Sequence, residues 1–334
     1  MTERQMQAVL LTRYGAPSTL SLQTIARPEL RPNDLLVRLR AAALNPIDLK
    51  LRQGYLRLLI RNRLPHVLGL DGAGDVVAVG KKVRDFQVGD AVFFSPDHKR
   101  FGSYAQYIAV DQRFVARKPE NLDYRQAASL PLCALTAHDA LAVTADLRGK
   151  RVLLNVGSGG VGTLAIQLAK QRGANVTASC STRTRSLVER LGADTLFDYR
   201  TDTLDNHPPF DLAIDMLGHP ARRALFKRIN RGGAIASLVS GVPEAVERTG
   251  LYRGTLSAIA GLVADWWRAR RRGIRFHNVV RKADGRTLAK IAELAAREQL
   301  KPVIDRVFPL AEVAEAHAYL QSGRAQGKVL LEIP

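Results

Sequence analysis

The sequence contains little cysteine and no long apolar run. Its two cysteines, Cys133 and Cys180, are too few for a disulfide framework or a four-cysteine metal lobe. No apolar stretch reaches the roughly 18 residues that a membrane-spanning helix needs. The first residues also lack the apolar core of a secretory signal peptide. These absences predict a cytoplasmic protein with no transmembrane segment.

Acidic residues are scarce as well. The 334 residues include 31 Asp and Glu against 50 Lys and Arg, which gives a formal net charge of +19. Such a charge attracts anionic ligands, nucleic acid or anionic membranes, although ordinary enzymes also carry basic surfaces. The length fits about two domains of roughly 100–200 residues each.

A glycine-rich turn lies between a strand-like run and a helical run. Residues 151–156 are mostly apolar, residues 157–162 include four glycines, and residues 161–168 repeat apolar side chains at helical spacing. A second strand-like run follows at 176–180. Strand, turn, helix and strand make one βαβ unit, in which such a turn binds a dinucleotide.

The glycines of this turn follow the G-x-G-x-x-G pattern. Gly157 permits a tight turn, Gly159 lets the backbone approach a pyrophosphate, and Gly162 lets the helix pack on the strand. The amino end of the helix offers N–H groups to the phosphates. The pattern alone also occurs in turns that bind nothing, but its place between strand and helix favours a dinucleotide. We therefore expect cofactor contacts from Gly157, Ser158, Gly159, Gly160, Val161 and Gly162.

The end of the second strand bears on which dinucleotide binds. NAD sites place Asp or Glu there, whereas this chain has no carboxylate between Cys180 and Glu189. Ser181 and Arg183 suit the extra phosphate of NADP, because a guanidinium pairs with phosphate through two hydrogen bonds. The alternative is that Arg183 is a solvated residue at a helix start. The sequence favours NADP(H).

Helical and strand-like runs alternate after residue 180, with strands expected at 195–199, 210–216 and 234–239. This alternation predicts an α/β fold with a doubly wound parallel sheet, preceded by a β-rich region over residues 1–124. Ligands of such sheets lie at the carboxyl ends of the strands. Three residues at those ends are further candidates for cofactor binding: Tyr199, Leu217 and Leu238.

A long amphipathic helix is expected at 251–267, followed by four arginines within residues 268–272. A basic amphipathic helix can lie on a membrane surface. Packing against its own protein or a partner subunit is the more common arrangement. The apolar side of the helix would carry Leu256, Ile259, Ala260, Val263, Trp266 and Trp267.

Several motifs together resemble the medium-chain dehydrogenase/reductase superfamily. Within it, the chain is similar to the zinc-free quinone oxidoreductases, the group that includes zeta-crystallin, and looks most like the reticulon-interacting-protein branch. The resemblance runs over nearly the whole chain. Its motifs are ALNPID at 43–48, GLDGAG at 69–74, GSYAQY at 102–107, the segment 130–137, the glycine turn and GKV at 327–329.

The resemblance implies a GroES-like catalytic domain over residues 1–124 and 284–334, and an NADP-binding Rossmann domain over residues 125–283. It also implies that the nicotinamide binds between the two domains and that the protein is a homodimer.

The resemblance also bears on zinc. Zinc alcohol dehydrogenases place Cys where Asn45 stands and His where Leu70 stands, and a leucine cannot ligate zinc. His66 lies nearby but lacks two matching partners. Without a Lewis acid, no evident group could activate an alcohol for oxidation. We therefore expect no metal, and hydride transfer from NADPH to quinones or α,β-unsaturated carbonyl compounds, whose conjugation spreads the incoming charge onto an oxygen.

The resemblance suggests four residues for the reaction. Asn45 matches the active-site asparagine of the family and Thr136 its pocket threonine, both near the nicotinamide or the acceptor. Tyr55 could donate a hydrogen bond or proton to the acceptor oxygen, and the Lys50 ammonium could serve the same oxygen. Asp48 is expected to hold local structure.

One alternative function remains open at this stage. The chain could be an NADPH-binding protein that uses its basic surface to hold nucleic acid or an anionic membrane with little catalysis. The sequence has no specific nucleic-acid motif, such as an RNP sequence or zinc finger, so charge is the only support for this alternative.

Overall fold

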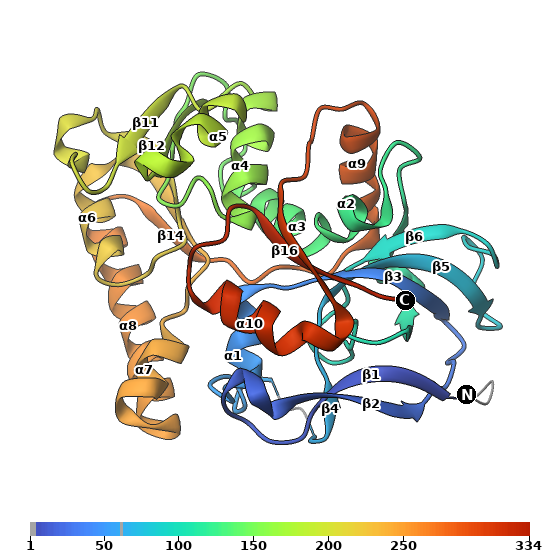
Figure 1. Cartoon of the computed structure of the whole chain (residues 1–334). Coiled ribbons are helices and arrows are strands. Elements are labelled where there is room, and N and C mark those ends of the chain that lie inside the picture. The colour runs from blue at the N-terminus through green and yellow to red at the C-terminus, as the bar shows by residue number, and fades with distance from the viewer. Residues whose placement is uncertain (1–4, 61–62) are drawn as a thin grey trace. The chain divides into compact units, whose positions relative to one another are not determined.

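The computed structural model describes residues 5–60 and 63–334. The chain divides into two compact units. Unit 1 comprises Met1–Leu135 and Lys282–Pro334, and unit 2 comprises Thr136–Arg281 (Figure 1). The first boundary falls inside helix α3 (Pro131–Leu141), whereas the resemblance places it after residue 124.

Unit 2 is built on a parallel sheet. In the described part of the chain it has six strands in the order β11-β10-β9-β12-β13-β14, and all neighbours pair in parallel. This order confirms the predicted Rossmann-type α/β sheet. The strands are β9 (Arg151–Leu154), β10 (Asn175–Cys180), β11 (Thr195–Asp198), β12 (Phe210–Asp215), β13 (Ile229–Ser237) and β14 (Arg275–Asn278).

Helices cover both faces of this sheet. The strand order runs outward from β9 in both directions, so right-handed crossovers put α4 and α5 on one face and α6 and α8 on the other (Figure 1). Phe210, Phe226 and Phe276 pack in the core under α6 and α8. The helices are α4 (Gly160–Gln171), α5 (Arg185–Arg190), α6 (Ala221–Arg228), α7 (Val242–Thr249) and α8 (Leu251–Arg271), with 3-10 turns η3 (Thr182–Thr184) and η4 (Leu204–Asn206).

Unit 1 contains two sheets. Among the described residues, the larger sheet has seven strands in the order β15-β16-β3-β5-β6-β8, with β7 also paired to β3, and the smaller has the order β2-β1-β4. The strands are β1 (Gln5–Leu11), β2 (Leu20–Ala26), β3 (Asp34–Ala43), β4 (His66–Val67), β5 (Asp71–Val79), β6 (Ala91–Phe94), β7 (Tyr107–Asp111), β8 (Val115–Arg117), β15 (Ile304–Pro309) and β16 (Lys328–Glu332).

The final strand closes unit 1. Strand β16 pairs antiparallel with β3, with Leu330 opposite Ala43, so the end of the chain lies beside the start of α1. The helices of unit 1 are α1 (Pro46–Arg52), α2 (Tyr124–Ala128), α9 (Gly285–Ala296) and α10 (Val313–Gln321), with 3-10 turns η1 (Pro17–Thr19), η2 (Gln112–Phe114) and η5 (Leu310–Glu312).

Some elements differ from the expectation. Strands β4 and β8 and helices α1 and α2 contain seven residues or fewer, too few to show a clear period, and they were not predicted. Strand β2 and helix α7, of seven and eight residues, were not predicted either. The sequence also indicates a last parallel strand at 277–281, whereas strand β14 begins at Arg275 and ends at Asn278. Strand β13 begins directly after α6 and includes Gly233, where a Cβ would lie 2.7 Å from the Asp211 carbonyl oxygen. This glycine therefore serves close strand packing rather than a turn. Within the described residues, no helix combines the length and apolarity needed to cross a membrane.

Candidate cofactor and active site

The glycine turn joins β9 to α4. The Gly157 amide donates to the Ser179 carbonyl oxygen at 2.8 Å, which ties the turn to the neighbouring strand β10. Gly159 is the N-cap of α4, and residues Gly160 to Gly162 form its first turn. The N–H groups at this helix end are available to an anion because the first turn of a helix has no internal acceptors.

The glycines of the turn serve different purposes. A Cβ at Gly162 would overlap the Val156 carbonyl oxygen, so the packing of α4 on β9 itself requires this glycine. A Cβ at Gly159 would meet only Val156 Cγ1, at 3.3 Å, and the backbone angles there (φ −79°, ψ 169°) suit any residue. The fold has little need of Gly159. Its bare backbone leaves the room that a pyrophosphate requires, so the turn fits a dinucleotide.

The carboxyl end of β10 leads into η3, with Ser181 as its N-cap and Arg183 exposed. A carboxylate that the linear sequence did not reveal lies close by. Asp198, at the end of the neighbouring strand β11, accepts hydrogen bonds from Thr182 Oγ1 and from the Arg200 amide, each at 3.0 Å. The Arg200 amide is the main cause that lowers the pKa of Asp198.

The remaining predicted cofactor residues lie at the ends of other strands of the sheet. Tyr199 follows β11 and is 56% exposed, and Leu217 follows β12 and is 55% exposed. The Leu238 amide donates to the Asp215 carbonyl oxygen at 2.8 Å, which sets the end of β13 beside that of β12. A hollow of about 420 Å³ opens at these two ends and is lined by residues that include Leu217, Gly218 and Ser240.

A buried ionic network holds the ends of β12 and β13 in place. Asp215 Oδ2 accepts from Ser237 Oγ at 2.8 Å, and Asp215 Oδ1 accepts from Asn155 Nδ2 at 2.9 Å. Arg222 of α6 donates to Ser237 Oγ at 2.8 Å and pairs with Asp265 of α8 at 2.9 Å. The network therefore connects three strand ends to helices α6 and α8.

Unit 1 buries a second polar cluster around Asn45. Asn45 Nδ2 donates to Asp71 Oδ2 at 2.9 Å, and Asn45 Oδ1 accepts from Lys328 Nζ at 2.5 Å. Lys328 Nζ also donates to the Leu44 carbonyl oxygen at 3.0 Å and lies 3.3 Å from Asp71 Oδ2. Asn45 and Asp71 are fully buried, and Lys328 is only 4% exposed. Both polar atoms of the Asn45 amide are thus used within unit 1.

The Lys328 ammonium remains charged in this cluster. Burial works to lower its pKa, but the Cys133 thiol and the Asp71 carboxylate outweigh burial, and the net pKa is raised. A positive charge therefore stands permanently beside the Asn45 amide oxygen at neutral pH.

Asp48 fixes the start of α1, as expected. Its Oδ2 accepts from the Asn45 amide at 2.8 Å and from the Tyr104 hydroxyl at 3.0 Å. Burial raises the pKa of Asp48 to about 7, although the bond from the Asn45 amide opposes the shift. The carboxyl group therefore gains a proton readily inside unit 1.

Lys50 and Tyr55 lie next to each other, both half-buried, with Lys50 Nζ 6.0 Å from the centre of the Tyr55 ring. The Tyr55 amide donates to the Lys50 carbonyl oxygen at 3.1 Å. The structure thus brings together two of the four predicted catalytic residues. Thr136 is buried and begins unit 2, within α3.

Two families of known proteins match this chain. Residues 31–120 match the alcohol dehydrogenase GroES-like domain, and residues 191–331 match the zinc-binding dehydrogenase family. The NADPH-dependent alkenal/one oxidoreductase of Arabidopsis thaliana is 35% identical, over 98% of this chain and 80% of its own. The chain belongs to the medium-chain dehydrogenase/reductase superfamily.

Other superfamily members agree. NAD(P)H oxidoreductase RTN4IP1 of Homo sapiens is 32% identical, over 98% of this chain and 89% of its own. The solved quinone oxidoreductase of Coxiella burnetii superposes with a TM-score of 0.87 at 31% identity, covering 99% of this chain and 100% of that one. These relatives confirm the predicted quinone oxidoreductase group. The chain is therefore a nicotinamide-dependent oxidoreductase.

The family name that mentions zinc does not describe the residues present. The positions where zinc members carry ligands hold Asn45 and Leu70. Across the described residues, no group of three or more His, Cys, Asp or Glu is arranged to hold a metal ion. His66 packs edge-on against Phe101, with ring centres 4.8 Å apart, and burial lowers its pKa.

Sequence reasoning missed two functional features of this superfamily member. Lys328 lies 283 residues from Asn45 and reaches it only because β16 pairs with β3. The GKV motif at 327–329 contained the signal, since a charged residue among apolar strand residues needs a buried partner. The second feature is the Asp215–Arg222–Asp265 network, whose members share no local sequence pattern.

Proposed function

We propose that this protein is a zinc-independent reductase that transfers hydride from NADPH to quinones or α,β-unsaturated carbonyl compounds. The names of the relatives support this class: alkenal/one oxidoreductase, 2-methylene-furan-3-one reductase and quinone oxidoreductase. Basic charge alone supported the nucleic-acid alternative, and we do not retain it.

The observation that carries the proposal is the Lys328 ammonium bonded to Asn45. Zinc members place a cation and its thiolate ligand at this position of the chain. Here the cation is the Lys328 ammonium. It donates hydrogen bonds to the Leu44 carbonyl oxygen and to Asn45 Oδ1, and it forms an ion pair with Asp71. A divalent metal beside a buried ammonium would be strongly repelled. The acceptor must therefore be electron-poor without help from a Lewis acid, and quinones and enones meet this requirement.

The residues that would hold the cofactor all belong to unit 2. We assign the pyrophosphate to Gly157–Gly162 and the end of the adenosine to Ser181, Arg183 and Tyr199. The nicotinamide is assigned to the strand ends at Leu217 and Leu238. Bound NADPH would supply the hydride for the electron-poor carbon of the acceptor.

The residues of unit 1 would serve the acceptor oxygen, where negative charge develops. We assign hydrogen-bond and proton donation to Tyr55 and Lys50, which lie together and are partly accessible. Asn45 enters the proposal as a positioning residue, because Asp71 and Lys328 already occupy its amide. We assign Thr136 to the nicotinamide or the acceptor.

NADPH consumption with a panel of ortho- and para-quinones and enones tests this function. The variants Tyr55→Phe and Lys50→Met would be measured singly and together. Loss of proton donation should lower kcat by about 100-fold or more in the double variant, with unchanged NADPH affinity. A protein that binds NADPH tightly yet reduces no acceptor in the panel would refute the proposed activity.

Arg183→Ala tests the preference for NADPH. Losing a charged hydrogen bond to phosphate should weaken NADPH binding by about 10- to 100-fold while NADH binding stays unchanged. Arg185→Ala is a matched control, because Arg185 pairs with Glu189 at 3.1 Å. Equal binding of NADH and NADPH by the unaltered protein would contradict the assignment.

We retain a homodimer and a cytoplasmic location as proposals. The two buried free cysteines suit a reducing compartment. Some relatives are named as chloroplastic or mitochondrial proteins, so localisation of a tagged full chain is the direct test.

A further inference from the structure

Helix α8 exposes its large apolar side chains and buries its small ones. Gly254, Thr255, Ala258, Asp265 and Ala269 face the rest of the protein. The exposed stripe consists of Tyr252 (71% exposed), Leu256 (69%), Ile259 (46%), Val263 (52%), Trp266 (44%) and Trp267 (52%). An amphipathic helix that served only its own fold would be oriented the other way. The stripe therefore favours an interaction with a partner outside unit 2.

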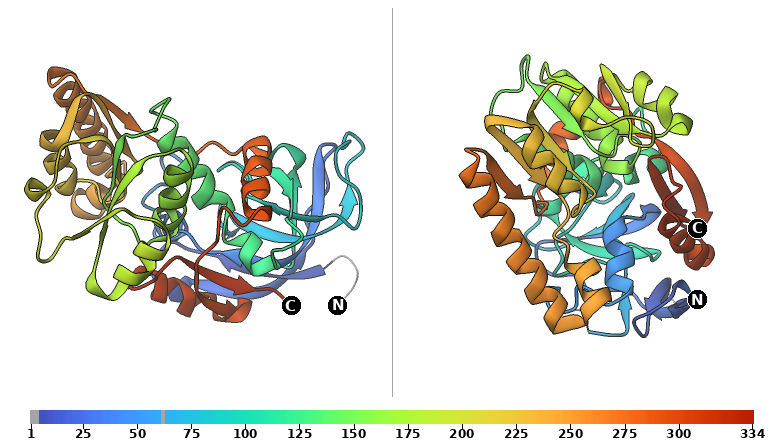
Figure 2. Two further views of the ribbon diagram at one scale, coloured as in Figure 1. Left: turned by 90° about the horizontal axis from the view of Figure 1, so that it is seen from above. Right: turned by 90° about the vertical axis from the view of Figure 1, so that its left-hand side faces the viewer.

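The stripe is long and continuous. Its members recur at three- and four-residue spacing over a helix of 21 residues, which is about 31 Å long. In the right view of Figure 2, α8 is the long orange helix at the edge of unit 2. Trp266 and Trp267 stand edge-to-face, with ring centres 5.1 Å apart, at the end of the stripe.

Positive charge borders the stripe. Residues 251–275 contain six arginines and one acid, Asp265. Asp265 is buried and is already paired with Arg222 and Arg268. Residues Arg253, Arg270, Arg271 and Arg272 are exposed. The outer surface of α8 is thus apolar along its middle and cationic along its margin.

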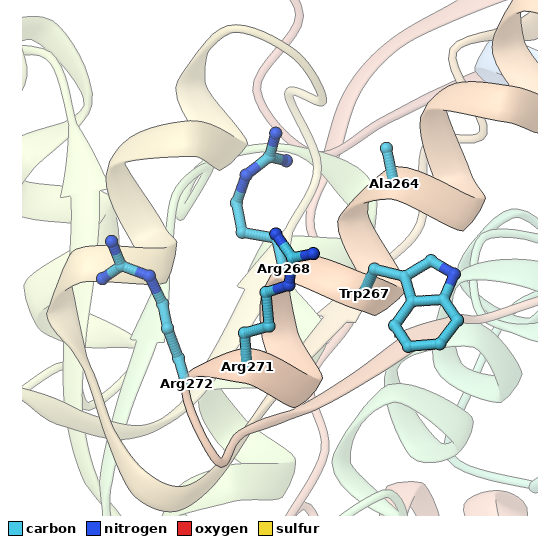
Figure 3. A pocket seen from close by; sticks show the side chains of 5 residues that line it. All are labelled: Ala264, Trp267, Arg268, Arg271 and Arg272. Atoms are coloured by element: carbon cyan, nitrogen blue, oxygen red, sulfur yellow. The ribbon is translucent and has the colours of Figure 1, made fainter.

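A hollow of about 560 Å³ lies beside the tryptophans, and Figure 3 shows its lining. The indole of Trp267 lies on one side of this hollow and the guanidinium of Arg272 on the other, with Arg268 and Arg271 between them. An apolar ring beside several guanidinium groups suits a ligand that carries both an anionic group and hydrocarbon.

These features select one kind of partner. A second copy of α8 would bring arginines against arginines with no exposed acid on either helix to pair them, which opposes self-association. A polynucleotide would use the arginines but not the aliphatic stripe. An anionic lipid bilayer uses both, because its phosphates attract the margin and its hydrocarbon accepts the stripe.

We infer that α8 docks this protein on the surface of an anionic lipid bilayer, with the stripe from Tyr252 to Trp267 inserted at the headgroup boundary. The helix lies along the interface and does not cross it. This inference concerns binding alone and does not depend on the proposed reductase activity.

The tryptophans make the test direct, because the chain contains only two and both lie on α8. Adding phosphatidylcholine vesicles that contain phosphatidylglycerol should shift the tryptophan emission to the blue, and brominated lipid should quench it. Pure phosphatidylcholine vesicles should leave both unchanged. Sedimentation of the protein with the vesicles measures the affinity.

Two pairs of variants separate the apolar and the ionic contributions to vesicle binding. Leu256→Ser should weaken vesicle binding by about tenfold or more, whereas Val88→Ser, an exposed valine of unit 1, should not. Arg253→Gln with Arg271→Gln should weaken binding by about fivefold for each arginine removed. Lys81→Gln with Lys82→Gln removes the same charge elsewhere and should have a smaller effect. NADPH oxidation without vesicles should not change in any of these variants.

Three results would overturn the inference. Tryptophan emission that vesicles do not change would show that α8 does not meet lipid. Tryptophans already shielded in the free protein, with Leu256→Ser converting dimers to monomers, would show that a second copy covers the stripe. Polynucleotide binding that depends on the arginines but not on Leu256, without vesicle binding, would assign the surface to nucleic acid.

Discussion

Unit 1 buries the cation Lys328, and unit 2 buries the cation Arg222. Lys328 pairs with one carboxylate, Asp71, and gives its shortest hydrogen bond to the amide of Asn45. Arg222 lies between two carboxylates, Asp215 and Asp265. The first cluster surrounds the single side chain of Asn45 at the start of α1. The second joins the ends of strands to two helices.

The two clusters differ in the kind of cation that each buries. A planar guanidinium with several donors suits a network that must connect strands and helices. A compact ammonium suits a small cluster built around one amide and one carboxylate. We therefore expect damage at Lys328 to affect turnover, and damage at Arg222 to affect cofactor binding and the stability of unit 2.

Lys328→Met should have the largest effect. It leaves Asp71 as an unpaired buried charge, which lowers the free energy of unfolding by about 3–5 kcal/mol. It also frees the Asn45 amide oxygen, so we expect kcat to fall by about 100-fold with unchanged NADPH affinity. Steady-state kinetics, NADPH titration and denaturant unfolding measure these three quantities.

A double variant keeps this prediction informative if Lys328→Met folds poorly. Lys328→Met with Asp71→Asn removes both charges and should recover much of the lost stability, because the buried carboxylate is gone. Turnover should stay low. Normal turnover in either variant would contradict the assigned role of Lys328.

Arg222→Met should destabilise unit 2 by a similar amount, about 3–5 kcal/mol, since it leaves the buried Asp215 without a cation and Asp265 with Arg268 alone. Unlike Lys328→Met, it should weaken NADPH binding, because Arg222 holds Ser237 and Val239 at the end of β13. Titration with NADPH and thermal unfolding measure the two effects. Lys227→Met, an exposed residue of α6 that does not line the hollow, is the control and should be close to neutral.

Gly159 and Gly162 of the turn should affect different properties of unit 2, cofactor binding and stability. Gly162→Ala forces a Cβ onto the Val156 carbonyl oxygen and should lower the free energy of unfolding by about 1–3 kcal/mol. Gly159→Ala should leave stability within about 0.5 kcal/mol of the original and weaken NADPH binding. A Gly159→Ala protein that binds NADPH normally would show that the phosphates lie elsewhere.

Asp48 should give an effect that is visible only as a pH dependence and whose slope becomes smaller near neutral pH. Its pKa is raised from 3.8 to about 7 in the folded protein, so the folded state keeps a proton that the unfolded state has released. Stability is therefore expected to fall as pH rises from about 4 to about 7, by at most about 1.4 kcal/mol per pH unit. Asp48→Asn should remove this slope, as urea unfolding at several pH values would show. An unchanged slope would mean that Asp48 is ionised throughout.

The sequence predicted most of the fold wherever its signals were local. The unit from β9 to β10 combines a strand, a glycine turn and a helix within about 30 residues. The spacing of its apolar residues and the glycine motif were therefore enough to predict it. Short elements such as α1 and β4 were missed because they contain too few residues to show a period.

The polar cluster around Asn45 was only partly predictable for a different reason. Asn45 came from a motif, but its partner Lys328 is distant in sequence, and strand pairing across the sheet brings the two together. The contact between Lys50 and Tyr55 could be predicted, because Lys50 lies in the last turn of α1 and Tyr55 follows only five positions later. The Arg222 network joins residues from three strands and two helices, and no sequence window contains it.

The central claim is that the buried Lys328 ammonium stands in place of a metal in a working reductase. Metal content and NADPH-dependent quinone and enone reduction, measured on the same chelator-treated protein, test it most directly. We expect full activity with no bound zinc, and loss of that activity in Lys328→Met. Zinc bound at about one ion per chain, with activity that disappears on chelation and returns when zinc is added, would contradict it.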